Sequence, residues 1–141
     1  MVKLDKIYTR GGDGGETSLA GGKRIAKHDL RVAAMGTVDE ANASIGVVRL
    51  HLTGEPDVLM GRVQNDLFDL GADLARPEEA DGGLKISTNQ VERLETEIDA
   101  YNLNLEPLTS FVLPGGTPAA AHLHNARTVT RRAERLVSNL R

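Results

Sequence analysis

The sequence predicts an all-α protein, an antiparallel helical bundle of the ferritin-like up-down type that follows a glycine-rich N-terminal loop. Three observations support this prediction. From residue 30 onward, apolar residues recur at spacings of three and four, which is the helical period. Start and stop signals divide that region into four helices with short connections. Strand-like alternation is nearly absent, and Phe111-Val112-Leu113 is short enough to be an ordered loop.

Residues 1–29 differ from the rest of the chain. Six of the fifteen glycines fall between Gly11 and Gly22, a density that predicts irregular backbone rather than regular secondary structure. One interpretation is a flexible tail. The other is a binding loop, because the segment also holds groups that bind anions or metals: Asp13, Thr17, Lys23, Arg24 and Lys27. We therefore expect one domain, with segment 1–29 preceding a bundle over 30–141.

The first two helices are predicted from one apolar stripe each. The first helix is expected to end at Gly54 and Pro56, and its stripe is Val38, Ala41, Ile45, Val48 and Leu52. Asp57 is expected to cap the second helix and Pro77 to close it. The buried side of that helix is predicted to hold Leu59, Val63, Leu67, Leu70 and Leu74.

The last two helices have clear start signals. Ser87 and Gln90 match a capping box for a third helix, whose stripe is Val91, Leu94, Ile98, Tyr101 and Leu105. Thr117 is a good N-cap for the fourth, and Pro118 suits its first position because no N–H is needed there. Its inner stripe is rich in small residues that allow close helix approach: Ala119, Leu123, Ala126, Thr130, Ala133, Val137 and Leu140.

Composition and charge exclude several classes of protein. The 141 residues include 17 basic and 20 acidic side chains, so the net charge of −3 argues against nucleic acid as a partner. With no cysteine, the chain has no disulfide, thiolate metal site or cysteine nucleophile. No run of apolar residues is long enough to span a membrane, and the N-terminus does not resemble a signal peptide. We expect a soluble, cytoplasmic protein.

The strongest chemical signal is a row of arginines on the last helix. Arg127, Arg131 and Arg135 are spaced by four and share one face. A solvated face with an Arg131–Glu134 pair is one interpretation; polyphosphate binding is the other, because guanidinium groups make bidentate phosphate contacts. Asp39 adjoins the first apolar stripe. It either faces solvent or pairs with a cation such as Arg127, from the same chain or a neighbouring one.

The glycine-rich segment matches no standard phosphate motif. Thr17 stands where a Walker A loop needs its first glycine, and Arg24 where it needs Ser or Thr. Glycine-turn amides can still form an anion-binding nest together with Thr9, Thr17, Ser18 and Lys27. No metal site is predicted, since His122 and His124 point to different faces of their helix. The residues alone favour a helical nucleotide binder.

Five segments, in order, resemble the PduO-type ATP:cob(I)alamin adenosyltransferases, also called corrinoid adenosyltransferases. Residues 6–17 resemble the family's Y-T-[RK]-x-G-D-x-G-x-T signature, and 36–42 its G-x-x-D-E-x-N helix. The other matching segments are 64–75, 111–116 and 126–135. Together the five segments extend over nearly all of the chain.

This resemblance implies an enzyme that transfers the 5′-deoxyadenosyl group of ATP to the cobalt of cob(I)alamin and releases triphosphate. It also implies Mg²⁺ with the triphosphate, a homotrimer with active sites between subunits, and a reductase or cobalamin-dependent enzyme as a further partner. Segment 1–29 would bind ATP. By matched position, the ATP contacts are Thr9, Arg10, Gly11, Gly12, Thr17, Ser18, Lys27, Arg131 and Glu134, with Arg135 nearby.

By the same resemblance, Asp39 and Arg127 match an inter-subunit ion pair, and Phe111 matches the aromatic residue that displaces the lower cobalt ligand. The family continues through another helix, so the four helices predicted here are expected to leave a hydrophobic groove open. Two other classes of function remain. One is a non-catalytic bundle that binds ATP or cobalamin, and the other is a purely structural helical oligomer.

Overall fold

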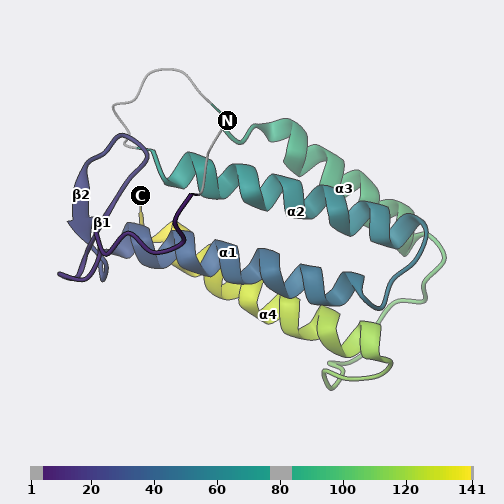
Figure 1. The fold of residues 1–141 in the computed structure, drawn as a ribbon. Helices are drawn as coiled ribbons and strands as arrows, with labels where there is room; N and C mark the ends of the chain where they lie inside the picture. Colours follow the sequence, from purple (N-terminus) through teal and green to yellow (C-terminus); the bar gives the residue numbers. More distant parts are fainter. Residues whose placement is uncertain (1–4, 77–83, 141) are drawn as a thin grey trace.

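The computed structural model describes residues 5–76 and 84–140, which form four helices and one small sheet (Figure 1). The helices are α1 (Leu30–Arg49), α2 (Glu55–Leu74), α3 (Thr88–Asn102) and α4 (Pro118–Ser138). They run alternately up and down, which confirms the predicted all-α antiparallel bundle (Figure 1). None of the helices in the described ranges is both long and apolar enough to cross a membrane.

Side-chain caps fix the start of three helices. Asp29 accepts a hydrogen bond from the Arg31 N–H at 2.8 Å at the start of α1. The predicted caps of α3 and α4 are confirmed: Ser87 forms a capping box with Gln90, and Thr117 accepts from the Ala120 N–H at 3.2 Å. These contacts satisfy N–H groups that have no partner within the helix.

The junction between α1 and α2 differs from the prediction. Gly54, at a φ of 67°, is the N-cap of α2, and Pro56 lies in its first turn. The expectations that Pro56 ends the first helix and that Asp57 caps the second are therefore wrong. The Asp57 carboxylate instead accepts from Arg49 Nε at 2.6 Å and Nη2 at 3.2 Å. Pro77, the expected end of α2, lies outside the described residues.

The N-terminal segment contains a hairpin that was not predicted. Strands β1 (Glu16–Ser18) and β2 (Arg24–Ala26) pair antiparallel, with Thr17 opposite Ile25 and Ser18 opposite Arg24. The expectation of irregular backbone is wrong for these residues because the glycines lie outside the strands. Gly15 and Gly22, at φ values of 83° and 81°, take the left-handed conformations that the flanking turns require.

The core is centred on α1, which packs against both α2 and α4. Its seam with α4 is built from small side chains, including Ala34 and Ala41 on α1 and Ala126 and Ala133 on α4, all buried. This confirms the predicted close approach of a helix to α4. The inner stripe of α4 is nevertheless partly wrong, because Thr130 is exposed and Val129 is buried.

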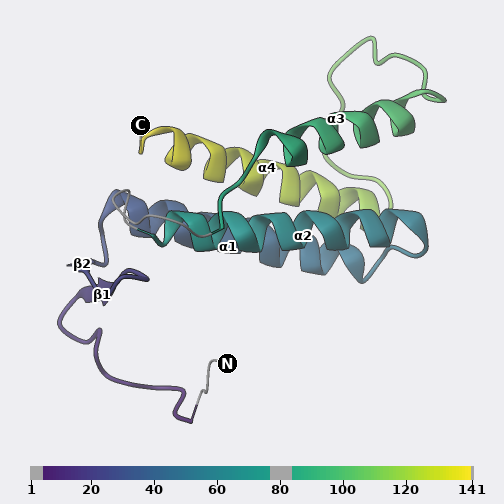
Figure 2. The same cartoon turned by 90° about the horizontal axis from the view of Figure 1, so that it is seen from above.

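Helix α3 stands apart from the other three (Figure 2). None of its residues is buried, and the predicted stripe is largely exposed, with Ile98 64% accessible. Ion pairs connect α3 to α2: Glu97 meets Arg62 at 2.7 Å, and Arg93 meets Asp66. Helical periodicity identifies an apolar face but not the helix that covers it.

Candidate functional site

The glycine loop closes around the side chain of Lys27. A Cβ atom at Gly12 would stand 2.8 Å from both Cε and Nζ of Lys27, so any larger residue would displace the end of the lysine side chain. The Lys27 N–H donates to the Gly15 carbonyl oxygen at 2.8 Å. Two turns shape the loop, since the N–H groups of Asp13 and Gly15 donate to the carbonyl oxygens of Arg10 and Gly12. The N–H groups of Gly11, Asp13 and Gly15 already donate within the loop, whereas those of Gly12 and Gly14 have no acceptor among the described residues. A cation thus lies beside a glycine turn with two undonated amides, an arrangement suited to an anion.

The residues that lead into this loop are basic and partly strained. Arg10 has a φ of 58°, which non-glycine residues rarely adopt. Its guanidinium lies 5.6 Å from the centre of the Tyr8 ring. Thr9 Oγ1 accepts from the Gly11 N–H at 3.5 Å. These residues and Lys6 line a hollow of about 500 Å³.

The hairpin separates two of the predicted ATP contacts. Because side chains alternate along a strand, Thr17 and Ser18 point to opposite faces. Ser18 shares its face with Arg24, whose Nη1 donates to Ser18 Oγ at 3.1 Å. Thr17 lies on the other face, where it and its partner Ile25 are half-buried.

Main-chain contacts attach the hairpin to one end of the bundle (Figure 1). The Ala20 N–H donates to the Ala75 carbonyl oxygen at 2.9 Å, just after α2. Leu19, in the turn between the two strands, is buried. The Arg31 side chain of α1 donates to the carbonyl oxygen of Leu74 at 3.1 Å and joins the start of α1 to the end of α2. The loop is therefore held where α1 begins and α2 ends.

The arginine row on α4 is exposed along its length. Arg127, Arg131 and Arg135 are all accessible, and Arg135 Nη1 donates to the Arg131 carbonyl oxygen at 3.0 Å. Within the described ranges, Arg131 and Glu134 form no ion pair. Arg132, next in sequence, instead pairs with Glu40 of α1, which fixes α4 against α1 beside the row.

Asp39 is exposed on α1 and, in the described part of this chain, makes no ion pair with Arg127. It borders a hollow of about 420 Å³ between α1 and α2, together with the exposed ring of Phe68. Asn42 lines the same hollow, and its Oδ1 is buried with no hydrogen-bond partner among residues 5–76 and 84–140. Phe68 could not be singled out from the sequence, because its position beside the helical stripe gives no separate signal.

The predicted site residues do not meet within one chain. Figure 2 shows α4 and the N-terminal segment on opposite sides of α1. The connection between α3 and α4, which carries the fully exposed Phe111, lies at the other end of the bundle from the hairpin (Figure 1). A single site that used the loop, the arginine row and Phe111 would need more than one copy of this chain.

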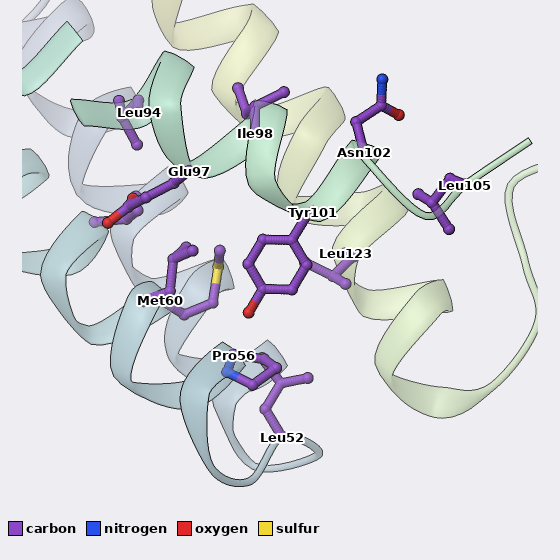
Figure 3. A pocket seen from close by; sticks show the side chains of 12 residues that line it. Leu52, Pro56, Met60, Leu94, Glu97, Ile98, Tyr101, Asn102, Leu105 and Leu123 are labelled. Carbon is purple, nitrogen blue, oxygen red and sulfur yellow. The ribbon is translucent and has the colours of Figure 1, made fainter. Parts of the chain in front are cut away.

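An apolar pocket of about 510 Å³ lies between α2, α3 and α4 (Figure 3). The ring of Tyr101 projects from α3 toward Met60 and Pro56, and Leu123 of α4 forms another wall (Figure 3). The lining is apolar apart from Glu97 and Asn102. The chemistry of this pocket does not suit a polyphosphate.

No group of three or more His, Cys, Asp or Glu residues that could hold a metal ion is found in residues 5–76 and 84–140. His122 stacks on His51 instead, with ring centres 4.9 Å apart and an angle of 9° between the planes. That contact joins the end of α1 to the start of α4.

A family model described as cobalamin adenosyltransferase matches residues 7–141. The corrinoid adenosyltransferase of Mycobacterium tuberculosis is 49% identical over 95% of this chain and 72% of its own length. That of Bacillus subtilis is 45% identical over 94% of this chain and 70% of its length.

Solved structures of similar sequence share the fold. A phenylalanine-to-alanine variant of the PduO-type ATP:corrinoid adenosyltransferase from Lactobacillus reuteri, complexed with cobalamin and ATP, superposes with a TM-score of 0.88. It is 39% identical over 96% of this chain and 77% of that chain. An arginine-to-lysine variant complexed with ATP gives a TM-score of 0.83 at 43% identity, over 95% of this chain and 77% of that one. This chain belongs to the cobalamin adenosyltransferase family.

Proposed function

We propose that this protein transfers the 5′-deoxyadenosyl group of ATP to the cobalt of cob(I)alamin and releases triphosphate. The observation that carries the proposal is the fold shared, over 96% of this chain, with a relative complexed with both cobalamin and ATP. The glycine loop around Lys27 adds support from this chain's own residues, since it presents amides and a cation to an anion.

For this reaction the protein must align ATP with cobalt and stabilise the charge on the leaving group. The Co(I) electron pair forms a bond to C5′ of ATP, and the C5′–O bond breaks with its electrons leaving on triphosphate. Cob(I)alamin is a strong nucleophile, so no general base is required. Placing C5′ against cobalt and stabilising the leaving polyphosphate are the remaining tasks. Cationic side chains and loop amides suit the second task.

We assign ATP binding to segment 1–29 and to one face of α4 within the 30–141 bundle. The proposed contacts are Thr9, Arg10, Gly11, Gly12, Thr17, Ser18, Lys27, Arg131 and Glu134, with Arg135 nearby. Mg²⁺ would accompany the triphosphate, as it does in other nucleotide sites, mainly through phosphate oxygens and waters. The ion would reduce the negative charge on the leaving triphosphate.

We further propose a homotrimer with its active sites between subunits. The glycine loop and the arginine row lie on different sides of α1 in one chain (Figure 2). A loop from one subunit and a row from the next can surround one polyphosphate. Asp39 and Arg127, both exposed, would form the ion pair across that boundary.

Phe111 is proposed to keep the lower face of the cobalt without an axial ligand, which makes Co(II) easier to reduce to Co(I). Its ring is fully exposed and free to contact a corrin. We expect Phe111→Ala to impair cobalt reduction and turnover more than ATP affinity. Steady-state kinetics with an ATP titration measures both, and unchanged turnover in the variant would refute this role.

We place the protein in the cytoplasm, with a reductase that supplies Co(I) or an enzyme that uses the product as partner. The test is an anaerobic assay of the purified chain with Mg-ATP and cob(I)alamin, read by absorbance and by triphosphate release. Adenosylcobalamin and triphosphate in equal amounts are expected. Binding of ATP or cobalamin without product would favour a non-catalytic binding protein, and no binding of either would favour a structural oligomer.

A further inference from the structure

We infer that Arg24 is a positioning residue that holds the glycine loop in the conformation that receives the polyphosphate, an inference that rests on the proposed function. In the sequence, Arg24 is one of several polar residues of the segment, with no signal of a separate role. In the structure the Arg24 side chain contacts Gly11, Glu16 and Ser18. Among the described residues, no side chain of the proposed ATP contacts has as many partners within the loop and hairpin.

The hairpin register brings these groups together. Ser18 is paired directly with Arg24. Since side chains alternate along each strand, Glu16, Ser18 and Arg24 lie on one face. Arg24 Nη1 donates to Ser18 Oγ at 3.1 Å, and its Nε lies 3.7 Å from a Glu16 carboxylate oxygen. The two contacts hold the guanidinium plane against the sheet.

The remaining guanidinium nitrogen contacts Gly11, which lies thirteen residues earlier in the sequence. Arg24 Nη2 donates to the Gly11 carbonyl oxygen at 2.8 Å, the shortest of its contacts. The Gly11 carbonyl and the Gly12 N–H belong to one planar trans peptide, so they point in opposite directions. By fixing the carbonyl, Arg24 therefore fixes the direction of the Gly12 N–H.

A clamp on this peptide has a specific physical purpose. Peptides flanked by two glycines rotate readily, because no Cβ restricts their torsions. A loop that adopts several conformations must lose that freedom when the anion binds, which weakens binding. Arg24 orders the peptide beforehand, while Lys27 makes no ion pair within the described ranges and stays available to the phosphate.

The experiment compares Arg24→Ala and Arg24→Lys with a matched control, Lys23→Ala. Lys23 is an exposed cation next to Arg24 with no side-chain contact in the described structure, so its loss tests charge alone. We expect Arg24→Ala to raise the Kd and KM for ATP about tenfold with kcat and the corrinoid KM little changed. Arg24→Lys should recover less than half of this loss, because an ammonium cannot donate to Ser18 and Gly11 in the fixed planar geometry of a guanidinium.

A second readout, free of substrate, is the ¹⁵N order parameter of the Gly12 amide without ATP. It should fall in Arg24→Ala and stay at the wild-type value in Lys23→Ala. Weaker ATP binding with an unchanged order parameter would mean that Arg24 contacts phosphate directly, which overturns the inference. So would full rescue by Arg24→Lys, or equal effects in Lys23→Ala. If the wild-type protein binds no ATP, the proposed function fails, while the order parameter still tests the clamp.

Discussion

The glycine loop and the arginine row of α4 carry the same kinds of charge but are organised in opposite ways. In the loop, the cations are exposed but contact their own chain: Lys27 lies against Gly12, and Arg24 donates to the Gly11 carbonyl oxygen. On α4 the guanidinium groups of Arg127 and Arg131 extend from a rigid helix into solvent. The glycine loop is ordered by contacts within the folded chain, whereas the arginine row of α4 would become ordered only on contact with a ligand or a second chain.

This difference has an energetic consequence. Ordering an arginine side chain costs about 2 kcal/mol of rotamer entropy. The Arg24 side chain is already ordered by its contacts in the folded loop before any ligand binds. The side chains of Arg127 and Arg131, which make no polar contact among the described residues, lose this entropy only on contact with a ligand or a second chain. Substitutions in the loop should therefore change affinity, whereas those on α4 should change rate and assembly.

The largest effect is expected from Arg131→Ala. Removing a cation that contacts the leaving triphosphate should lower kcat/KM for ATP by about 10²–10³-fold. The melting temperature should stay near the wild-type value, because the side chain is exposed. Steady-state kinetics and thermal denaturation measure the two effects, with Arg135→Ala as the control of smaller effect. Equal losses in both variants would mean that the row acts through bulk charge.

A charge exchange between Asp39 and Arg127 tests whether α4 meets a second chain. Asp39→Arg or Arg127→Asp alone should weaken the proposed trimer at least tenfold, by about 1.4 kcal/mol or more. The double variant should restore it, since the opposite charges then face each other again. Light scattering across a dilution series reports the assembly state. Trimers of normal stability in the single variants would remove this pair from the interface.

A smaller effect, confined to the loop, is expected from Gly12→Ala. The new methyl group must displace the end of Lys27, so ATP affinity should fall several-fold to about tenfold. Gly14→Ala is the matched control, because a Cβ there has no atom within 4 Å. Calorimetric titration with Mg-ATP compares them. Loss of affinity in Gly14→Ala as well would indicate that the whole loop tolerates no side chain.

The smallest effect on activity is expected away from both regions, at Asp57. The hydrogen bond from Arg49 holds the pKa of this carboxyl below its ordinary value. A lowered folded-state pKa stabilises the fold above the unfolded-state pKa, and that contribution is lost as the pH falls through the folded-state value. Asp57→Asn should lower the melting temperature at neutral pH, with a difference that shrinks below about pH 4. A difference that persists in acid would contradict this origin.

Features that depend on local sequence could be predicted, and those that depend on distant partners could not. The caps at Ser87 and Thr117 were predicted because cap and helix are neighbours in sequence. The hairpin could not be, since strands of three residues depend on the anchor at Ala75. The partner of Asp57 was missed because capping rules do not take account of Arg49, eight residues away.

Prediction of the candidate site is likewise limited to features that depend on local sequence. The row of Arg127, Arg131 and Arg135 follows from helical spacing, which is local. The reach of Arg24 to Gly11 requires the strand register, which sequence pattern does not supply. That the loop and the row lie on different sides of α1 is a property of the folded chain alone (Figure 2).

The most direct test of a site shared between chains is complementation between two inactive variants. Lys27→Ala lacks the loop cation and Arg131→Ala lacks the α4 cation, so at an ATP concentration well below KM each alone should lose nearly all of its activity. Subunits mixed in equal amounts and reassembled should recover about a quarter of the wild-type activity, because one site in four then combines an intact loop with an intact row. Mixed trimers that stay inactive would contradict the shared site.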